Sequence, residues 1–156
     1  MNNRGVTLIT VIIMISVILI LSAIFVSTSL ESLEEAKKAE RKTEIYQLHL
    51  AVMDRYTMYE KNQGNISLIG TLAKSKWTTA SECLNEILST VDFSELESGE
   101  KAKKIEKITN EIARDYDEYV MLVNSGDVTR LGVDKVSGAT YIVDYYTGSV
   151  YGPIEE

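Results

Sequence analysis

Histidine, cysteine and proline each occur only once among the 156 residues, and this scarcity excludes several kinds of site. The single histidine, His49, falls within a long predicted helix, so neither a histidine-based triad nor a zinc site with several histidines can form. The single cysteine, Cys83, excludes an intrachain disulfide, and its helical spacing with neighbouring apolar residues predicts a buried, unreactive thiol. No Gly-rich phosphate loop is present. We therefore expect a protein that is not an enzyme and that has neither a cofactor nor a metal.

Charge is missing from the chain between Arg4 and Glu31. The range 6–30 also lacks glycine and proline, and only Thr and Ser interrupt its apolar residues. As a helix that rises about 1.5 Å per residue, this range extends over roughly 37 Å, enough to cross the hydrocarbon core of a bilayer with some tilt. The hydroxyl groups of Thr7, Thr10 and Ser16 can donate to carbonyl oxygens of the same helix and so permit its burial in lipid. We predict a membrane-spanning helix over 6–30.

Three kinds of N-terminal segment contain such an apolar run. A secretory signal peptide has a shorter run that ends at small residues, but here the run continues past the nearest such site, Ser22-Ala23. An uncleaved signal anchor needs neither a glycine directly before the run nor a Thr-Leu-Ile-Thr start. A prepilin has a short polar leader that ends in glycine and is removed on the cytoplasmic side, while the apolar segment stays on the mature protein. The residues favour the prepilin.

The junction before the run resembles the cleavage and methylation signature of type IV pilins and type II secretion pseudopilins; its residues are Arg4-Gly5-Val6-Thr7-Leu8-Ile9. The resemblance implies that a prepilin peptidase cuts between Gly5 and Val6 and that the new amino terminus at Val6 is methylated. It also implies a pilin-like α+β fold, in which a long N-terminal helix, membrane-spanning in its first half, packs on a small antiparallel sheet with extra helices between. The implied partners are the peptidase, other pilin-like subunits, an inner-membrane assembly platform and the lipid bilayer.

One position departs from the pattern of this family. Major pilins and pseudopilins usually have a glutamate five residues into the mature chain, where this sequence has Thr10. A carboxylate inside a membrane is costly and persists where it has a charged partner, which in the family is thought to be the terminal amine of a neighbouring subunit. Because Thr10 offers only a hydroxyl, we expect a minor or initiating subunit, or a pilin-like protein that does not polymerise by itself.

The remainder of the chain is acidic. All 23 Asp and Glu lie beyond residue 30 with all of the 16 Lys and Arg except Arg4, which gives this outer part a formal charge of −8. Such a domain has no basic stripe to neutralise phosphates, so we expect no direct contact with nucleic acid. Arg4 on one side of the apolar run and the acidic part on the other predict a single-pass protein of the cell membrane or a surface filament, with a cytoplasmic N-terminus and an extracellular C-terminal domain.

The predicted helix continues beyond the membrane range through 31–61, which contains neither glycine nor proline. Two rows of residues recur there at spacings of three and four, as on the face of a helix. The first row is a narrow seam of the coiled-coil kind: Ala36, Ala39, Thr43, Tyr46, Leu50 and Met53. The second row predicts where the helix meets a folded domain: Ile45, Leu48, Val52, Tyr56 and Tyr59. The breaker cluster Asn62-Gln63-Gly64-Asn65 predicts the end of the helix.

The resemblance to pilins implies that the range 62–117 is a variable region, and its residues predict two helices. A capping box formed by Thr79 and Glu82 precedes a short amphipathic helix over 83–91. A second helix is predicted over about 99–116, with Ile105, Ile108 and Ile112 on one face. Its lysines alternate with glutamates, which is typical of a solvated helix surface.

The range 118–156 predicts a C-terminal antiparallel sheet. Strands are expected at 118–124, 140–145 and 149–151, the last two joined by a turn at 146–148. Between the first two strands, one helical turn over 127–132 is expected, with Asp127 as its N-cap and Gly132 as its terminator. The final hairpin resembles the terminal hairpin of clostridial pilin-like proteins.

Two alternatives remain open at this point. Asp127, Asp134 and Asp144 are oxygen ligands suited to calcium, but their spacing matches no loop motif, and turn and cap roles explain them better.

Together, these predictions give the domain order: a leader (1–5), a membrane and filament-core helix (6–30), its continuation (31–61), the variable region (62–117) and the sheet (118–156). The alternative function is a signal-anchored extracellular binding or receptor domain that does not polymerise. A pilus, a secretion system and a DNA-uptake apparatus fit the sequence equally.

Overall fold

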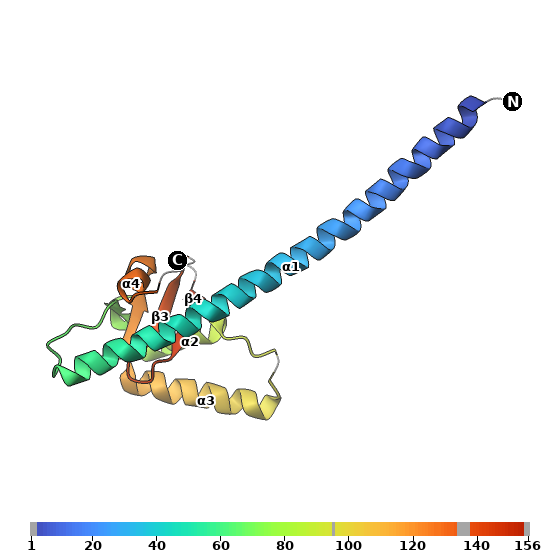
Figure 1. Cartoon of the computed structure of the whole chain (residues 1–156). Coiled ribbons are helices and arrows are strands. Elements are labelled where there is room, and N and C mark those ends of the chain that lie inside the picture. Colours follow the sequence, from blue (N-terminus) through green and yellow to red (C-terminus); the bar gives the residue numbers. More distant parts are fainter. Residues whose placement is uncertain (1–2, 95, 134–137, 155–156) are drawn as a thin grey trace. The chain divides into compact units, whose positions relative to one another are not determined.

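The computed structural model describes the backbone of residues 3–94, 96–133 and 138–154, and within these ranges all side chains except those of 3–11, 21 and 23–31. Over this part of the chain the fold is α+β, with five helices and one four-stranded antiparallel sheet. The elements in chain order (Figure 1) are α1 (Asn3–Lys61), β1 (Thr71–Leu72), the 3-10 helix η1 (Ala73–Ser75), α2 (Ala80–Thr90), α3 (Ser98–Asp115), β2 (Val120–Val123), α4 (Ser125–Arg130), β3 (Thr140–Asp144) and β4 (Val150–Ile154).

Internal contacts divide the chain into two units, Met1–Arg41 and Lys42–Glu156. The first unit consists of the N-terminal part of α1. Ser16 Oγ donates to Ile12 O at 2.9 Å and Ser22 Oγ to Ile18 O at 2.8 Å, which confirms for Ser16 the predicted bond to its own helix. Where side chains are described, no helical stretch is long and apolar enough to cross a membrane. Of the predicted span 6–30, the side chains of 6–11, 21 and 23–30 lie outside this description.

The second unit is built on the sheet, whose strand order is β1-β2-β3-β4 with every neighbouring pair antiparallel. In the central pair, Val120 of β2 lies opposite Asp144 of β3, and Val123 lies opposite Tyr141. The register of β3 with β4 shifts between Thr140 and Ile142. Because the central strands have protein on both faces, they are apolar at successive positions, as β2 and β3 are.

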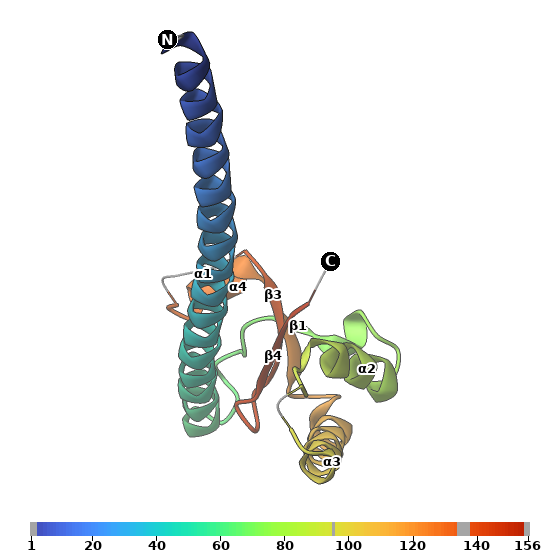
Figure 2. The ribbon, with the colours of Figure 1, turned by 90° about the vertical axis from the view of Figure 1, so that its right-hand side faces the viewer.

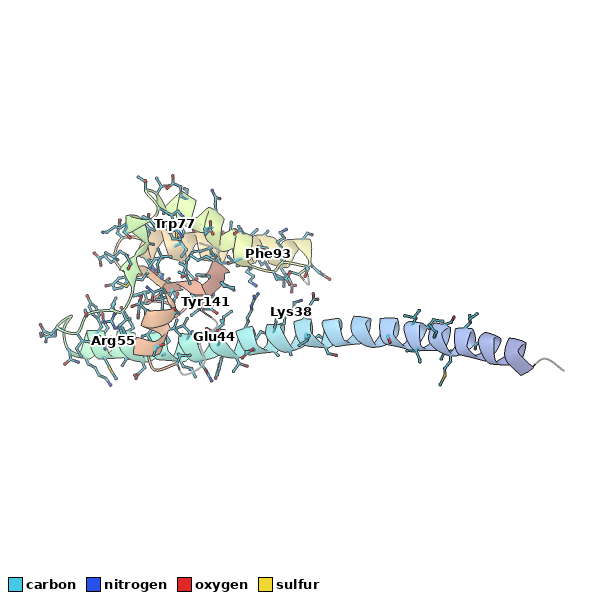
Figure 3. All side chains as sticks on the ribbon, turned by 90° about the horizontal axis from the view of Figure 1, so that it is seen from above. Lys38, Glu44, Arg55, Trp77, Phe93 and Tyr141 are labelled. Atoms are coloured by element: carbon cyan, nitrogen blue, oxygen red, sulfur yellow. The ribbon has the colours of Figure 1, made fainter. Side chains whose placement is uncertain are left out.

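Two apolar cores cover the two faces of the sheet (Figure 2). One core contains Ile87 of α2, Ile112 of α3 and Ile142 of β3. The other contains Leu48 and Val52 of α1, Val128 of α4 and the intervening sheet residues Tyr141 and Val143. In Figure 3, Trp77 and Phe93 lie on the side of the sheet away from α1, with Tyr141 in between. The second unit therefore has three layers.

The predicted second row of α1 is the face that packs on the sheet. Leu48 and Val52 are fully buried, and Ile45 and Tyr56 pack around them. The helix ends at Lys61, as the breaker cluster predicts. Gly64 has a φ of 78° and its N–H donates to Tyr59 O at 2.9 Å, which gives the helix a glycine terminator.

Both helices predicted in the variable region are confirmed, and their observed ends differ from the predicted ends by one to three residues. Thr79 accepts from the N–H of Glu82, whose carboxylate accepts in return from the N–H of Thr79, so the capping box at the start of α2 is also confirmed. The range 62–117 additionally contains β1, an edge strand of two residues that the sequence analysis did not predict.

The three predicted C-terminal strands are present with different ends: β2 is shorter than 118–124, and β4 extends beyond 149–151 to Ile154. The prediction of Asp127 as an N-cap was wrong. The N-cap of α4 is Asn124, and Asp127 is the third helical residue, whose carboxylate accepts from the N–H of Asn124. Gly132 does terminate this helix, with a φ of 85° and an N–H that donates to Thr129 O at 3.0 Å.

Candidate processing and assembly site

The residues assigned to processing and assembly belong to the first turns of α1. The backbone of Gly5, Val6 and Thr10 is helical. Their side chains lie outside the described part of the structure. Cleavage between Gly5 and Val6, methylation of Val6 and a contact role for Thr10 therefore stay predictions.

The described side chains that follow form an apolar surface around α1. Eight of the nine residues from Ile12 to Ile20 are large and apolar, and each of the eight is 48–65% exposed. Because only Ser16 interrupts them, they occupy every side of the helix rather than one face. A helix that is apolar all round is stable in an apolar surrounding, either lipid or the helices of other proteins. Among the described side chains of α1, those from Ile12 to Ile20 are suited to such a contact.

Within the second unit, α1 has a second exposed row on the side away from the sheet. Tyr46 is 63% exposed, Leu50 51% and Met53 39%, in contrast to the buried Leu48 and Val52. These three residues belong to the predicted coiled-coil seam, at spacings of four and three. Tyr46 and Leu50 therefore lie outside the core that Leu48 and Val52 form with the sheet.

The structure brings together a buried acidic pair that the sequence does not predict. Asp115 is the last residue of α3 and Asp144 the last of β3, and they are 3% and 0% exposed. The guanidinium of Arg114 donates to both carboxylate oxygens of Asp115, at 2.7 Å and 2.6 Å. The Asp144 carboxylate accepts from the N–H of Tyr146 at 3.0 Å and from Thr147 Oγ1 at 2.8 Å. This arrangement joins α3 to the turn between β3 and β4.

The protonation of this pair follows from its surroundings. Burial raises the pKa of Asp144 to about 6, with a further rise from the charge of Asp115 and a hydrogen bond to its carboxyl, against the opposing bonds from Thr147 and Tyr146. The hydrogen bonds to Asp115 raise the pKa of Arg114, so this guanidinium stays charged. One carboxyl of the pair is thus poised to hold a proton at mildly acidic pH.

A cluster of tyrosines lies beside the acidic pair. The ring of Tyr56 is 5.7 Å from that of Tyr119 and 6.0 Å from that of Tyr146, both edge to face. Arg114 lies over Tyr146, with its guanidinium 4.5 Å from the ring centroid. These contacts link α1, the segment before β2 and the β3–β4 turn. Burial and the neighbouring Glu60 raise the pKa of Tyr56 to about 12, so Tyr56 stays neutral at physiological pH.

The other side chains considered in the sequence have structural surroundings. Cys83 is fully buried, and burial raises its pKa to about 12, which confirms the prediction of a buried thiol. His49 Nδ1 lies 2.6 Å from the carbonyl oxygen of Gly148, so the one imidazole binds the backbone of the β3–β4 turn. The lysines of α3 are exposed, as predicted for a solvated surface.

Of the three aspartates considered for calcium, Asp127 and Asp144 have separate structural surroundings. Asp127 accepts within α4 and pairs with Arg130 at 3.1 Å, and Asp144 belongs to the acidic pair. Asp134 lies outside the described residues. No group of three or more potential metal-binding side chains exists among the residues that are described. Asp127 takes part in the capping box of Asn124 instead of being the predicted N-cap, and Asp144 has the predicted role in a turn.

The acidic pair has one sequence signal, an aspartate inside an otherwise apolar strand. Asp144 follows Tyr141, Ile142 and Val143 directly, and all of β3 is buried. No spacing rule points from Asp144 to Asp115, because their contact depends on how α3 returns to the sheet. Comparison with known proteins adds no assignment: neither protein-family models, nor curated proteins, nor solved structures match this chain.

Proposed function

We propose that the chain is a pilin-like structural subunit, a minor pilin or pseudopilin of a type IV pilus, a type II secretion-like or a competence-type filament. The supporting observation is that the prepilin-like junction and the long helix that packs on the sheet begin at the same place in the chain. The Gly5-Val6 junction, with its resemblance to the prepilin signature, stands at the start of a helix that continues to Lys61. The last turns of that helix pack on a small antiparallel sheet through Leu48 and Val52.

The proposed mechanism has three steps. Prepilin peptidase hydrolyses the peptide bond after Gly5, and the new amino terminus at Val6 is methylated. The apolar range 6–30 keeps the processed subunit in the membrane until an assembly platform transfers it into a filament. There the apolar surface around Ile12 to Ile20 exchanges lipid for the helices of neighbouring subunits, so the transfer exposes little additional apolar area to water.

Thr10 sets the proposed place of this subunit in the assembly. A glutamate at this position would offer a charge to a neighbouring amine inside an apolar surrounding, whereas Thr10 offers one hydroxyl. The contact that aligns successive subunits is therefore weaker here than in a major pilin. This favours a subunit that depends on other pilin-like subunits for its incorporation.

A fractionation experiment tests the proposal. In cells that normally produce the protein, we expect the wild type in the filament fraction sheared from the surface and a Gly5→Val variant retained in the membrane. Gly99→Val is a matched control, because a Cβ at Gly99 meets no atom within 4 Å, and it should fractionate as the wild type. The proposal is contradicted when Gly5→Val enters the sheared fraction as efficiently as the control.

The second candidate function is a signal-anchored binding or receptor domain, and the absence of the family glutamate at Thr10 favours it. In that case the chain keeps Met1 to Gly5 and stays in the membrane in both variants. The same fractionation therefore separates the two candidates, since only the filament subunit depends on Gly5.

A further inference from the structure

The junction between the end of α3 and the β3–β4 turn contains a carboxyl group without a cation of its own. Arg114 donates from Nε and Nη2 to the two carboxylate oxygens of Asp115, one bond to each. Asp144, which is fully buried, receives only neutral donors, the N–H of Tyr146 and the hydroxyl of Thr147. Two ionised carboxylates at this place would repel each other where both are buried, and the one guanidinium that is hydrogen-bonded there, Arg114, binds Asp115.

We propose that the contact between Asp115 and Asp144 is a proton-dependent latch that holds the β3–β4 turn against the end of α3. With a proton on Asp144, its carboxyl donates to the carboxylate of Asp115 and the latch is closed. Loss of that proton to solvent leaves two acceptors and two negative charges in contact, and the turn separates from α3 so that water can reach Asp144.

The turn is the element that such a latch would release. It is short, its end at Gly148 is held by a backbone bond to Asp144 O at 2.8 Å, and the 49% exposed ring of Tyr146 lies at its surface. Arg114 bridges both sides, because it binds Asp115 and lies over the ring of Tyr146. Separation of the turn would therefore also release Tyr146 from Arg114 and change the tyrosine cluster.

The other titratable groups around the junction have hydrogen-bond or ring partners other than Asp144, although the charge of Asp144 also acts on Tyr151 of β4. On α1, His49 contacts Gly148 O and Tyr56 contacts the rings of Tyr119 and Tyr146. On α3, Glu111 accepts from the hydroxyl of Tyr151 of β4 at 3.3 Å. Arg114 is the only basic side chain that faces the pair among the residues described, and it is committed to Asp115.

The expected pH range follows from the pKa of Asp144, which burial and the neighbouring Asp115 raise from 3.8 to about 6. A carboxyl whose pKa is higher when the latch is closed binds its proton more tightly in that state, here about 100-fold. The proton on Asp144 therefore stabilises the closed state fully below about pH 4. This stabilisation decreases as the pH rises and is lost above about pH 6. Between pH 5 and pH 7.5 the opening equilibrium should increase about tenfold.

The test follows the latch in the full chain, held in a mild detergent. Carbon NMR of the Asp144 carboxyl should give a titration midpoint near pH 6. After correction for the intrinsic exchange rate, hydrogen exchange should show about tenfold less protection of the Tyr146 and Gly148 amides at pH 7.5 than at pH 5. Asp144→Asn, which mimics the protonated carboxyl, should abolish this difference, and the exposed Asp117→Asn should leave it unchanged.

Two further variants separate the latch from other causes. His49→Gln should keep the pH dependence, and it is a suitable control because His49 contacts the same turn. Asp115→Asn should lower the midpoint of Asp144, since it removes the neighbouring charge, and this holds even where Asp144→Asn fails to fold. A midpoint for Asp144 near pH 4, or a protection loss that persists in Asp144→Asn or disappears in His49→Gln, would overturn the proposal.

Discussion

Gly132 and Gly148 share a backbone conformation but differ in their surroundings. Their φ angles are 85° and 74°, both in the left-handed region that glycine adopts without strain. A Cβ at Gly132 would meet nothing within 4 Å, whereas a Cβ at Gly148 would lie 2.4 Å from the sulfur of Met53 and 3.0 Å from a ring carbon of His49. Gly148 thus fits the β3–β4 turn closely against α1, while Gly132 only ends a helix.

Alanine substitutions at these glycines should separate the cost of the left-handed backbone conformation from the cost of a clash with α1. Gly132→Ala should lower the free energy of unfolding by about 1 kcal/mol, the cost of placing a Cβ in a left-handed conformation. Gly148→Ala should lower it by about 1–3 kcal/mol more, because Met53 must also move. Urea denaturation of the full chain in detergent measures both values. Equal losses would show that the turn does not pack tightly on α1.

Cys83 should be inert in the folded protein. The thiolate is the reactive form, and full burial together with a pKa raised to about 12 leaves little of it accessible at pH 8. Iodoacetamide should therefore leave Cys83 unmodified in the native chain and alkylate it in guanidinium, as measured by intact mass. A Ser89→Cys variant supplies an exposed thiol on the same helix and should be alkylated without denaturant. Rapid labelling of native Cys83 would contradict the packing of α2.

The two faces of α1 within the second unit serve different purposes. Leu48 and Leu50 are only two positions apart, yet Leu48 is fully buried and Leu50 is 51% exposed. Because a helix turns about 100° per residue, this spacing places them on opposite sides. The buried row stabilises the domain, and the exposed Tyr46 and Leu50 are the residues that we propose for contact with another subunit.

Alanine substitution at these two leucines tests the assignment of the faces. Leu48→Ala should lower the free energy of unfolding by about 2–5 kcal/mol, since it opens a cavity between α1 and the sheet. Leu50→Ala should change it by less than about 0.5 kcal/mol. Denaturant unfolding of both variants gives the comparison. A larger loss for Leu50→Ala would mean that the seam, and not the second row, packs on the sheet.

Elements with strong local signals could be predicted from the sequence. The breaker cluster at Gly64 and the capping box at Thr79 set the end of α1 and the start of α2, because both depend on neighbouring residues only. Asn124 was missed as the N-cap of α4, since Asp127 is an equally good capping residue and the choice depends on where β2 ends. The two-residue β1 has no sequence signal of its own, because its pairing with β2 alone makes it a strand.

The candidate sites also differ in whether they depend on neighbouring residues in the sequence or on contacts that the fold creates. A motif that is contiguous in sequence, such as Gly5-Val6, can be recognised without a structure. The contact of Asp115 with Asp144 could not, because it depends on the packing of α3 and β3 after both have formed. Arg114 belongs to this site for the same reason: its sequence neighbours suggest a solvated helix end, while the fold places it over Tyr146.

The chain combines an apolar stretch with an acidic remainder. The described side chains from Ile12 to Ile20 are, except Ser16, large, apolar and exposed, while the acidic residues all lie beyond residue 30. The second unit has its own cores on both faces of a sheet, so it does not need the apolar helix for its interior. The described part of the apolar stretch does not belong to these cores, which fits the contact with lipid and other helices that we propose.

Intact-mass spectrometry of the protein purified from its own cells tests the central claim most directly. A pilin-like subunit should have lost residues 1–5 and gained the mass of one methyl group at Val6, and a Gly5→Val variant should have the full-length, unmethylated mass. A full-length, unmethylated wild type would contradict the account and leave a tethered domain that does not enter a filament.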